Sequence, residues 1–168
     1  MSNPYASLIQ AQNLTYGPIR NLTFAWPAGV SWVCGDEGKG KTTLLRLLAG
    51  HMQPDVGTVT LPSGGVFWVD LQSPTHDAIT VQACWDDLRM QYPHWNDAVL
   101  IDLAEAMDMH PHREKQLHML SAGSRRKVMV LAALASGAAV TLLDQPFAAL
   151  DLRSVQIIQE FLSEAAEH

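Results

Sequence analysis

The sequence is poor in cysteine, in positive charge and in long apolar runs. Its two cysteines are too few for a disulfide framework and suit a reducing cytosol. Acidic residues outnumber basic ones by 17 to 11, giving a net charge of −6, which argues against a nucleic-acid partner. The longest uncharged run, residues 128–143, is shorter than the roughly 20 apolar residues of a membrane-spanning helix. We therefore expect a soluble protein, and docking on a membrane-bound partner stays open.

The length of 168 residues suits one domain with a sizeable core. The opening, Met1-Ser2-Asn3-Pro4, has neither the basic start nor the apolar run of a secretory signal. No internal repeat or low-complexity segment is present in the sequence. We expect a single domain over residues 1–168.

A glycine-rich stretch at residues 34–43 is the most informative feature. It reads Cys34-Gly35-Asp36-Glu37-Gly38-Lys39-Gly40-Lys41-Thr42-Thr43. The apolar run Val30–Cys34 before it predicts a buried strand, and Leu44–Gly50 after it has a helical pattern closed by a glycine. Strand, glycine loop and helix in this order are the context that the phosphate-loop pattern G-x-x-x-x-G-K-[ST] requires. The alternative, an ordinary glycine turn before a helix, explains the flanks less well.

The glycines, Lys41 and Thr42 of this stretch suit a triphosphate. The glycines let successive backbone N–H groups turn inward around phosphates, and the helix N-terminus adds partial positive charge. Lys41 is placed to reach the β- and γ-phosphates, and the Thr42 hydroxyl is placed to ligate Mg²⁺. The sequence therefore predicts a nucleoside triphosphate site.

Five other apolar stretches predict strands. They are Ser7–Thr15, Arg20–Phe24, Thr58–Leu61, Val66–Val69 and Ala139–Leu143. Tyr16 follows the first strand, where an aromatic side chain commonly covers the core at a turn. Asp144 follows the last strand, which is continuously apolar, as in buried parallel sheets. A carboxylate there is placed to hold Mg²⁺ through water, and its alternative role is to cap a turn.

The middle of the chain reads as helical. One amphipathic face is formed by Val81, Cys84, Trp85, Leu88 and Tyr92. We interpret Trp85 and Trp95 as core residues rather than a partner surface. A second helix is expected over Asp97–Met109. His110, His112 and His118 lack cysteine or carboxylate partners at ligand spacing, so a solvated loop is favoured over a metal site.

The segment Leu120-Ser121-Ala122-Gly123-Ser124 opens another helix, with Ser121 as its predicted N-cap. Its exposed N–H groups predict a second anion-binding helix start, although the same residues are also common in loops. The apolar face of this helix comprises Val128, Leu131, Ala132 and Ala135. A last helix is expected to run to about Ala165. Its inward residues are predicted to be Leu152, Val155, Ile158, Phe161 and Leu162.

Together these motifs resemble the nucleotide-binding domain of the ABC ATPases over the whole chain. The resemblance implies an α/β P-loop NTPase fold with a mostly parallel core sheet, an N-terminal antiparallel β part and a helical subdomain at roughly residues 75–136. The Leu-Ser-Ala-Gly start of the segment at residue 120 and the Gln-Pro-Phe-Ala-Ala-Leu-Asp run resemble haem-exporter-type ATPases of cytochrome c maturation.

The resemblance assigns roles residue by residue. Tyr16 matches the aromatic that stacks on adenine. Residues 35–43 match Walker A, with Lys41 at the reacting phosphate and Thr42 on Mg²⁺. Gln72 matches the Q-loop glutamine, which touches Mg²⁺ and senses the transmembrane partner. Ser121, Ala122 and Gly123 match the nucleotide-contacting part of the signature motif, usually Leu-Ser-Gly-Gly-Gln. Asp144 matches the Walker B magnesium ligand, and Asp151 matches the D-loop aspartate.

The implied mechanism uses ATP and Mg²⁺ between two such domains. The domains close head to tail, so that each ATP lies between Walker A of one chain and the signature helix of the other. Closure moves helices of a transmembrane permease subunit, and hydrolysis reopens the pair. The resemblance thus implies a cytoplasmic protein, peripheral on the inner face of the membrane through its partner. Whether the pair is a homodimer or a heterodimer stays open.

Three departures from the family pattern bear on activity. Ala122 and Ser124 replace glycine and glutamine of the signature motif. Gln145 stands where the family has its catalytic glutamate, so we expect slow hydrolysis, and the sequence does not decide whether this glutamine is natural or was introduced to trap ATP. The H-loop histidine has no counterpart, and His168 is too near Asp144 to replace it. We expect that a longer chain or another segment supplies this region.

Two other functions remain open. A degenerate regulatory module would bind ATP to hold a complex together and scarcely turn over. A soluble ABC ATPase of repair or translation is disfavoured, because such proteins usually carry two domains or a long coiled-coil insertion. The transported substrate and its direction of movement are not encoded in these motifs.

Overall fold

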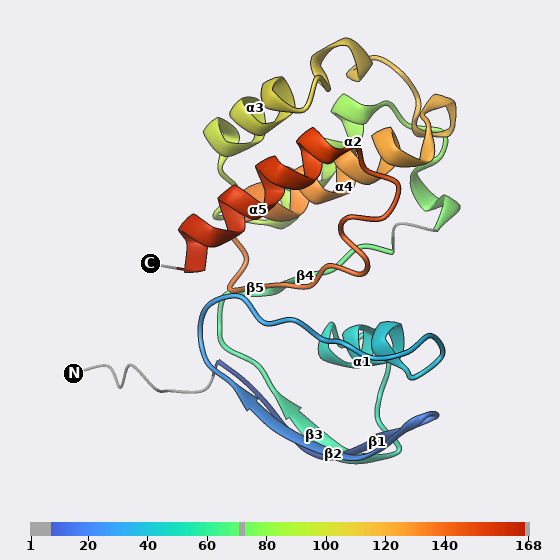
Figure 1. Ribbon diagram of the computed structural model, residues 1–168, viewed down its shortest axis with the longest axis vertical. Helices are drawn as coiled ribbons and strands as arrows, with labels where there is room; N and C mark the ends of the chain where they lie inside the picture. Colours follow the sequence, from blue (N-terminus) through green and yellow to red (C-terminus); the bar gives the residue numbers. More distant parts are fainter. Residues whose placement is uncertain (1–7, 71–72, 167–168) are drawn as a thin grey trace, which may run out of the picture. The chain divides into compact units, whose positions relative to one another are not determined.

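The computed structural model describes residues 8–70 and 73–166 (Figure 1). The described residues divide into two compact units. Unit 1 comprises residues 8–64 together with 161–166, and unit 2 comprises the described residues between 65 and 160. The predicted Q-loop residue Gln72 lies outside the described residues.

Unit 1 contains a three-stranded antiparallel sheet in the order β2-β1-β3. The strands are β1 (Ile9–Tyr16), β2 (Ile19–Trp26) and β3 (Val56–Thr60). The buried residues of β1 are Ile9, Ala11 and Leu14, so strict alternation breaks after Ala11. Asn13, with φ 51°, lies at this break, where the register with both neighbours shifts. The irregularity returns Leu14 to the buried face. The predicted N-terminal antiparallel part is confirmed.

Helix α1 (Lys41–Leu48) belongs to the same unit, and Figure 1 shows it facing one side of the sheet. Its four leucines are buried at Leu44, Leu45, Leu47 and Leu48. The helix stops where Gly50 adopts φ 74°, and His51 N–H donates to Arg46 O at 3.0 Å, satisfying a late helical carbonyl. The helix and its glycine stop are as predicted.

The predicted buried strand Val30–Cys34 is wrong. Residues 31–36 have no regular secondary structure, and Trp32 is 59% exposed. Among the described residues, no strand pair includes this segment. An apolar run favours a strand only where neighbouring strands supply hydrogen bonds and cover its faces. Apolar composition alone therefore predicted a strand that this segment does not form.

Unit 2 contains a parallel pair formed by β4 (Val66–Phe67) and β5 (Val140–Thr141). The hydrogen bond from Leu142 N–H to Phe67 O, 2.8 Å long, extends the pair by one residue. Both strands were expected to be longer, over 66–69 and 139–143. Parallel strands need a long connection, and here it is helical. It contains α2 (Val81–Gln91), α3 (Asp97–Ala106) and α4 (Ala122–Ala135).

Trp85 lies on the predicted amphipathic face of α2, where the alternatives were a core residue and a partner surface. Its side chain is 1% exposed, and its indole Nε1–H donates to Val128 O of α4 at 3.0 Å. A buried indole with its N–H satisfied stabilises the core. Trp85 is therefore a core residue, as interpreted from the sequence. Cys84 beside it is fully buried, and burial raises the pKa of its thiol to about 12.

Polar side chains begin all three connecting helices. Thr80 accepts from Ala83 N–H, Asn96 accepts from Val99 N–H, and Ser121 accepts from Ser124 N–H, each at 3.1 Å. Each such cap contributes about 1 kcal/mol to helix stability. The Ser121 cap confirms the prediction for α4.

Two predictions about the helices are corrected. Helix α3 ends at Ala106 rather than Met109, because Asp108 adopts φ 57° and a short 3-10 helix follows at His110–His112. In α5 (Leu152–Ala166), Leu152 is 72% exposed, not inward, while Ile158 is buried as expected. Asp151 caps the first turn of α5 by accepting from Ser154 N–H. In this turn Ser154 is buried and Leu152 is not.

No helix within residues 8–70 and 73–166 has both the length and the apolar character needed to cross a membrane.

Candidate functional site: a phosphate loop and a signature helix

The glycine-rich loop leads directly into α1 in unit 1. Gly40 is the N-cap residue, with φ 94°, and no side chain caps the helix. The first turn contains no acidic residue, and Leu44 N–H donates to Gly40 O at 2.8 Å. A helix start of this kind favours an anion through its N–H groups and its dipole. The local structure therefore fits a bound phosphate.

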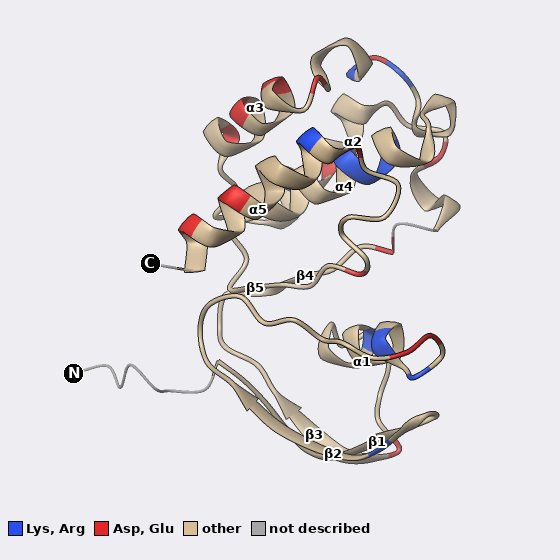
Figure 2. Ribbon diagram, in the orientation of Figure 1, with Lys and Arg blue, Asp and Glu red and all other residues tan. Residues whose placement is uncertain are grey.

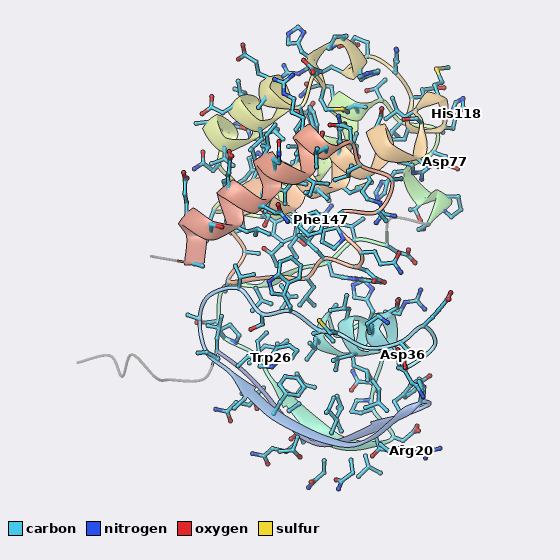
Figure 3. All side chains as sticks on the ribbon, viewed as in Figure 1. Arg20, Trp26, Asp36, Asp77, His118 and Phe147 are labelled. Atoms are coloured by element: carbon cyan, nitrogen blue, oxygen red, sulfur yellow. The ribbon has the colours of Figure 1, made fainter. Side chains whose placement is uncertain are left out.

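Lys41 turns back over the loop that precedes it. Its Nζ donates to Gly35 O at 2.6 Å and to Asp36 O at 2.7 Å. Figure 3 labels Asp36 in this loop. These two bonds hold the ammonium group against the loop, while the backbone of Lys41 begins α1. The cation and the helix start thus converge on one small region.

The loop depends on glycine at two positions. Gly38 and Gly40 have φ 75° and 94°, a region that costs other residues about 1–2 kcal/mol. At Gly40 a Cβ atom would also lie 2.9 Å from Pro18 Cγ and 3.2 Å from an Ile19 side-chain carbon. Gly40 is therefore required by backbone conformation and by close packing.

This packing brings Tyr16 near the loop. Tyr16 is the last residue of β1 and pairs with Ile19 across the tight turn that contains Gly17 and Pro18. Since Pro18 and Ile19 pack on Gly40, the turn that follows Tyr16 adjoins the phosphate loop. Unit 1 thus gathers Tyr16 and the loop at residues 35–43, including the exposed Glu37 and Lys39 and the half-buried Thr42 and Thr43.

The predicted signature residues lie at the start of α4 in unit 2. Ser121 Oγ accepts from Ser124 N–H and donates to Ser124 Oγ at 3.0 Å. Ala122 is exposed. Gly123 packs so closely on the chain that an added Cβ would lie 2.4 Å from Ala149 O. Both Ser121 and Ala122 are accessible, whereas Gly123 is fixed against the segment predicted to be the D-loop.

Asp144 and Gln145 follow β5 and begin a turn over residues 144–149, here called the Walker B turn. Asp144 is half-buried and Gln145 is exposed. Gln145 has φ 48° and Ala149 has φ 62°, both uncommon for residues other than glycine. The bond from Ala148 N–H to Gln145 O, 3.1 Å long, closes part of the turn. The exposed glutamine side chain therefore extends from a tightly defined backbone.

Asp151 makes its contacts within this chain. Its carboxylate accepts from Lys127 Nζ at 2.8 Å and from Ser154 N–H at 2.9 Å, and it also accepts from the Ser154 hydroxyl. The Lys127 ammonium, and then the Ser154 donors, hold the pKa of Asp151 well below its usual range. The carboxylate caps α5 and joins it to α4.

Three consecutive cations, Arg125, Arg126 and Lys127, follow the predicted signature segment and were not among the predicted site residues. Arg125 donates to Ser73 O at 2.9 Å and forms an ion pair with Asp77, which Figure 3 labels beside His118. Arg126 donates to the carbonyls of Asp144 and Gln145, and Lys127 binds Asp151. Figure 2 colours the Lys and Arg residues of α4 blue. A run of cations just after a predicted anion-binding helix start was the available signal.

The described residues therefore form two groups of predicted site residues. Unit 1 gathers Tyr16 and residues 35–43, and unit 2 gathers Ser121–Gly123, Asp144, Gln145 and Asp151 around α4. In the described parts of the chain, no cluster of three or more histidine, cysteine or acidic side chains could hold a metal ion by itself.

Comparison with known proteins agrees with this geometry. The ABC transporter family model matches residues 19–148. The chain is 32% identical over 150 residues to a cytochrome c biogenesis ATP-binding export protein, CcmA, from Pseudomonas syringae, covering 81% of this chain and 69% of that protein. It is 31% identical over 160 residues to a taurine import ATP-binding protein, TauB, from Pseudomonas entomophila, covering 89% of this chain and 58% of that protein.

A solved structure of an ABC transporter in an inward-facing conformation superposes with a TM-score of 0.74 at 25% identity. The match covers 96% of this chain and 69% of that one. A P-loop with its helix, an antiparallel N-terminal sheet and a capped signature helix define an ATP-binding domain of the P-loop class. The chain belongs to the ABC transporter family. Within that family it is an ATP-binding domain.

Proposed function

We propose that the chain binds ATP with Mg²⁺ at the loop of residues 35–43 and drives a transport partner by ATP-dependent dimerisation. The observation that carries this proposal is the position of Lys41. Its Nζ lies within hydrogen-bond distance of two loop carbonyls, beside a helix start that has no side-chain cap. Three features that favour anions (a cation, helical N–H groups and a helix dipole) meet there.

The triphosphate is held by unit 1. The Lys41 ammonium attracts the β- and γ-phosphates, and the amides of the loop and of the first turn of α1 donate to phosphate oxygens. Tyr16 stacks on the adenine, because its turn adjoins Gly40. Stacking adds about 0.5–1.5 kcal/mol, less than the charged phosphate contacts contribute.

The residues also fit Mg²⁺. Hard cations of this size prefer oxygen ligands and keep several waters. The family pattern assigns three oxygen donors to the ion: the Thr42 hydroxyl would ligate it directly, the Asp144 carboxylate would hold it through water, and Gln72 would supply an amide oxygen. When bound, Mg²⁺ neutralises charge on the phosphate oxygens.

The partners follow from the signature helix. Ser121 and Ala122 are exposed at the start of α4, where N–H groups favour an anion. We assign them, with the backbone of Gly123, to the γ-phosphate bound by a second nucleotide-binding chain. A transmembrane permease subunit completes the complex and holds it at the cytoplasmic face of the membrane. CcmA is named for export and TauB for import, so the direction of transport is left open.

Turnover is proposed to be slow because Gln145 occupies the position of the catalytic base. An amide can orient a water molecule by hydrogen bonding but cannot take its proton. A missing general base typically lowers the rate by about 10²–10⁴-fold. The alternative, a regulatory module that binds ATP and scarcely turns over, shares this residue and is distinguished only by its rate.

ATP-dependent assembly provides the test. Sedimentation equilibrium is run without nucleotide, with AMP and Mg²⁺, and with ATP and Mg²⁺. We expect a monomer in the first two conditions and a dimer in the third. Lys41→Ala should remain monomeric with ATP, while Lys39→Ala, which changes an exposed cation of the same loop, should dimerise. Identical mass in all conditions for the native sequence, alone and with a co-purified permease, would refute the assembly.

A further inference from the structure

Arg126 makes an unusual pair of contacts at the end of β5. Its Nη1 donates to Asp144 O at 3.2 Å and to Gln145 O at 2.6 Å. The donor lies in the second turn of α4, and the acceptors are two consecutive peptide carbonyls. One guanidinium nitrogen therefore fixes two neighbouring peptide units at once.

These carbonyls lie where the sheet no longer satisfies the backbone. The bond from Leu142 N–H to Phe67 O extends the ladder beyond β5, and the Walker B turn begins two residues later. A carbonyl that leaves a sheet near the core needs another donor. Arg126 supplies a charged donor, whose hydrogen bonds are stronger than those of a neutral group.

The contact also accounts for the conformation of Gln145. Consecutive carbonyls point to opposite sides in an extended strand. Here both reach the same nitrogen, and Gln145 has φ 48°. The left-handed conformation costs a non-glycine residue about 1–2 kcal/mol. Two bonds to a cation offset that cost and select this turn over an extended continuation of β5.

We propose that Arg126 is a positioning residue for ATP turnover. It holds the peptide units of Asp144 and Gln145, and so it sets the direction of the carboxylate that serves Mg²⁺ and of the amide that orients water. This inference rests on the proposed function for the roles of those two side chains. It further implies that the Walker B turn and the signature residues share one rigid support.

Two neighbouring contacts reinforce that support. Gly123 packs on Ala149 O at the end of the Walker B turn, and Lys127 binds Asp151 just beyond it. Positions 123, 126 and 127 thus contact successive parts of one segment. A rotation of α4 would move the signature start and the Walker B turn together.

The test compares Arg126→Met with Arg126→Lys. Methionine fills the space of the apolar stem without a donor, whereas lysine keeps a cationic donor. Arg153→Met is the control, since Arg153 is an exposed side chain that pairs with the exposed Asp108. ATP hydrolysis is followed with labelled ATP under single-turnover conditions, so that slow rates are measurable. Thermal melting is recorded for every variant.

We expect Arg126→Met to lower the single-turnover rate constant at least about tenfold and to leave ATP affinity unchanged, because misplaced catalytic groups lose rate rather than binding. Arg126→Lys should recover most of that loss, and Arg153→Met should match the native sequence. Equal rates for Arg126→Met and the native sequence would overturn the proposal. So would equal losses in the methionine and lysine variants, since volume or folding would then explain the effect.

Hydrogen exchange decides the matter without turnover. The amides of Ala148, in the Walker B turn, and Leu150, just after it, donate to Gln145 O and Phe147 O of the turn. Figure 3 labels Phe147 in this turn. Both amides should exchange at least about fivefold faster in Arg126→Met than in Arg126→Lys or Arg153→Met. Unchanged exchange would contradict the positioning role of Arg126 even if the chain binds ATP. Absence of ATP binding would refute the proposed function, but the exchange rates would still test whether Arg126 holds the turn.

Discussion

Lys127 Nζ lies 2.8 Å from Asp151 Oδ2, and this ion pair joins the signature helix α4 to the start of α5. The same carboxylate caps α5 through Ser154 N–H. Lys127 also donates to Met107 O at 3.2 Å, so one cation links three elements of unit 2. The segment that carries the signature residues is therefore fastened at several points to the segment after β5.

Acid should weaken this link, because the pKa of Asp151 is held below its ordinary value of about 3.9 by Lys127 and Ser154. A depressed carboxyl pKa contributes stability that is complete above the unfolded-state value and is lost as pH falls through the folded-state value. Asp151→Asn should therefore melt lower than the native sequence at about pH 7, and the difference should shrink below about pH 4. Melting curves across this range, with Lys127→Met as the matched partner change, measure the effect. A difference that stays constant with pH would contradict the pairing.

Gly123 should not tolerate a side chain. A Cβ atom there would lie 2.4 Å from Ala149 O, so either α4 or the Walker B turn must move. Overpacking of this kind typically costs about 1–3 kcal/mol. We expect Gly123→Ala to lower the urea midpoint accordingly, while Ala122→Ser, at the exposed neighbouring position, changes it little. Equal midpoints for Gly123→Ala and the native sequence would show that the contact is loose.

The two cysteines should differ sharply in reactivity. Cys84 is buried, with its thiol pKa raised to about 12, whereas Cys34 is exposed immediately before the phosphate loop. A thiol reagent reacts with thiolate, so the folded chain should react at Cys34 alone and at both sites after denaturation. ATP with Mg²⁺ should slow labelling of Cys34, and AMP should not. Rapid labelling of Cys84 in the folded chain would contradict its burial.

Sequence patterns located the features that depend on local chemistry. The Ser121 cap, the glycine stop of α1 and the buried face of α2 follow from short-range preferences and were predicted. The segment Val30–Cys34 was not, because strand formation depends on neighbours that an apolar run does not specify. Leu152 was misplaced for a related reason, since the polar cap at Asp151 determined which side of the first turn of α5 is buried.

The contacts of Arg126 could not be anticipated from the sequence. Its acceptors are backbone carbonyls 18 and 19 residues away. Because every residue has a backbone carbonyl, residue identity does not show which carbonyls accept. Gly123 likewise resembles any glycine of a signature motif until its contact with Ala149 is seen. The sequence thus predicts which residues form the candidate site, and the structure adds contacts that residue identity does not encode.

Replacing Gln145 with glutamate should raise hydrolysis. A carboxylate at this exposed position can accept a proton from water, whereas the amide cannot. We expect Gln145→Glu to increase the single-turnover rate at least about tenfold with little change in ATP affinity. Gln156→Glu, an exposed change of the same kind on α5, controls for added negative charge. An unchanged rate would show that Gln145 is not at the catalytic position.

The central claim, that residues 35–43 hold the triphosphate of ATP, is tested most directly by calorimetric titration of ATP with Mg²⁺ into the native chain, Lys41→Ala and Lys39→Ala. Because Lys41 supplies the charge at the centre of the loop, Lys41→Ala should weaken binding by at least about 2 kcal/mol. Tyr16→Ala should weaken it by about 1 kcal/mol through lost stacking, and Lys39→Ala should have little effect. Equal affinity of Lys41→Ala and the native chain for ATP would contradict the account.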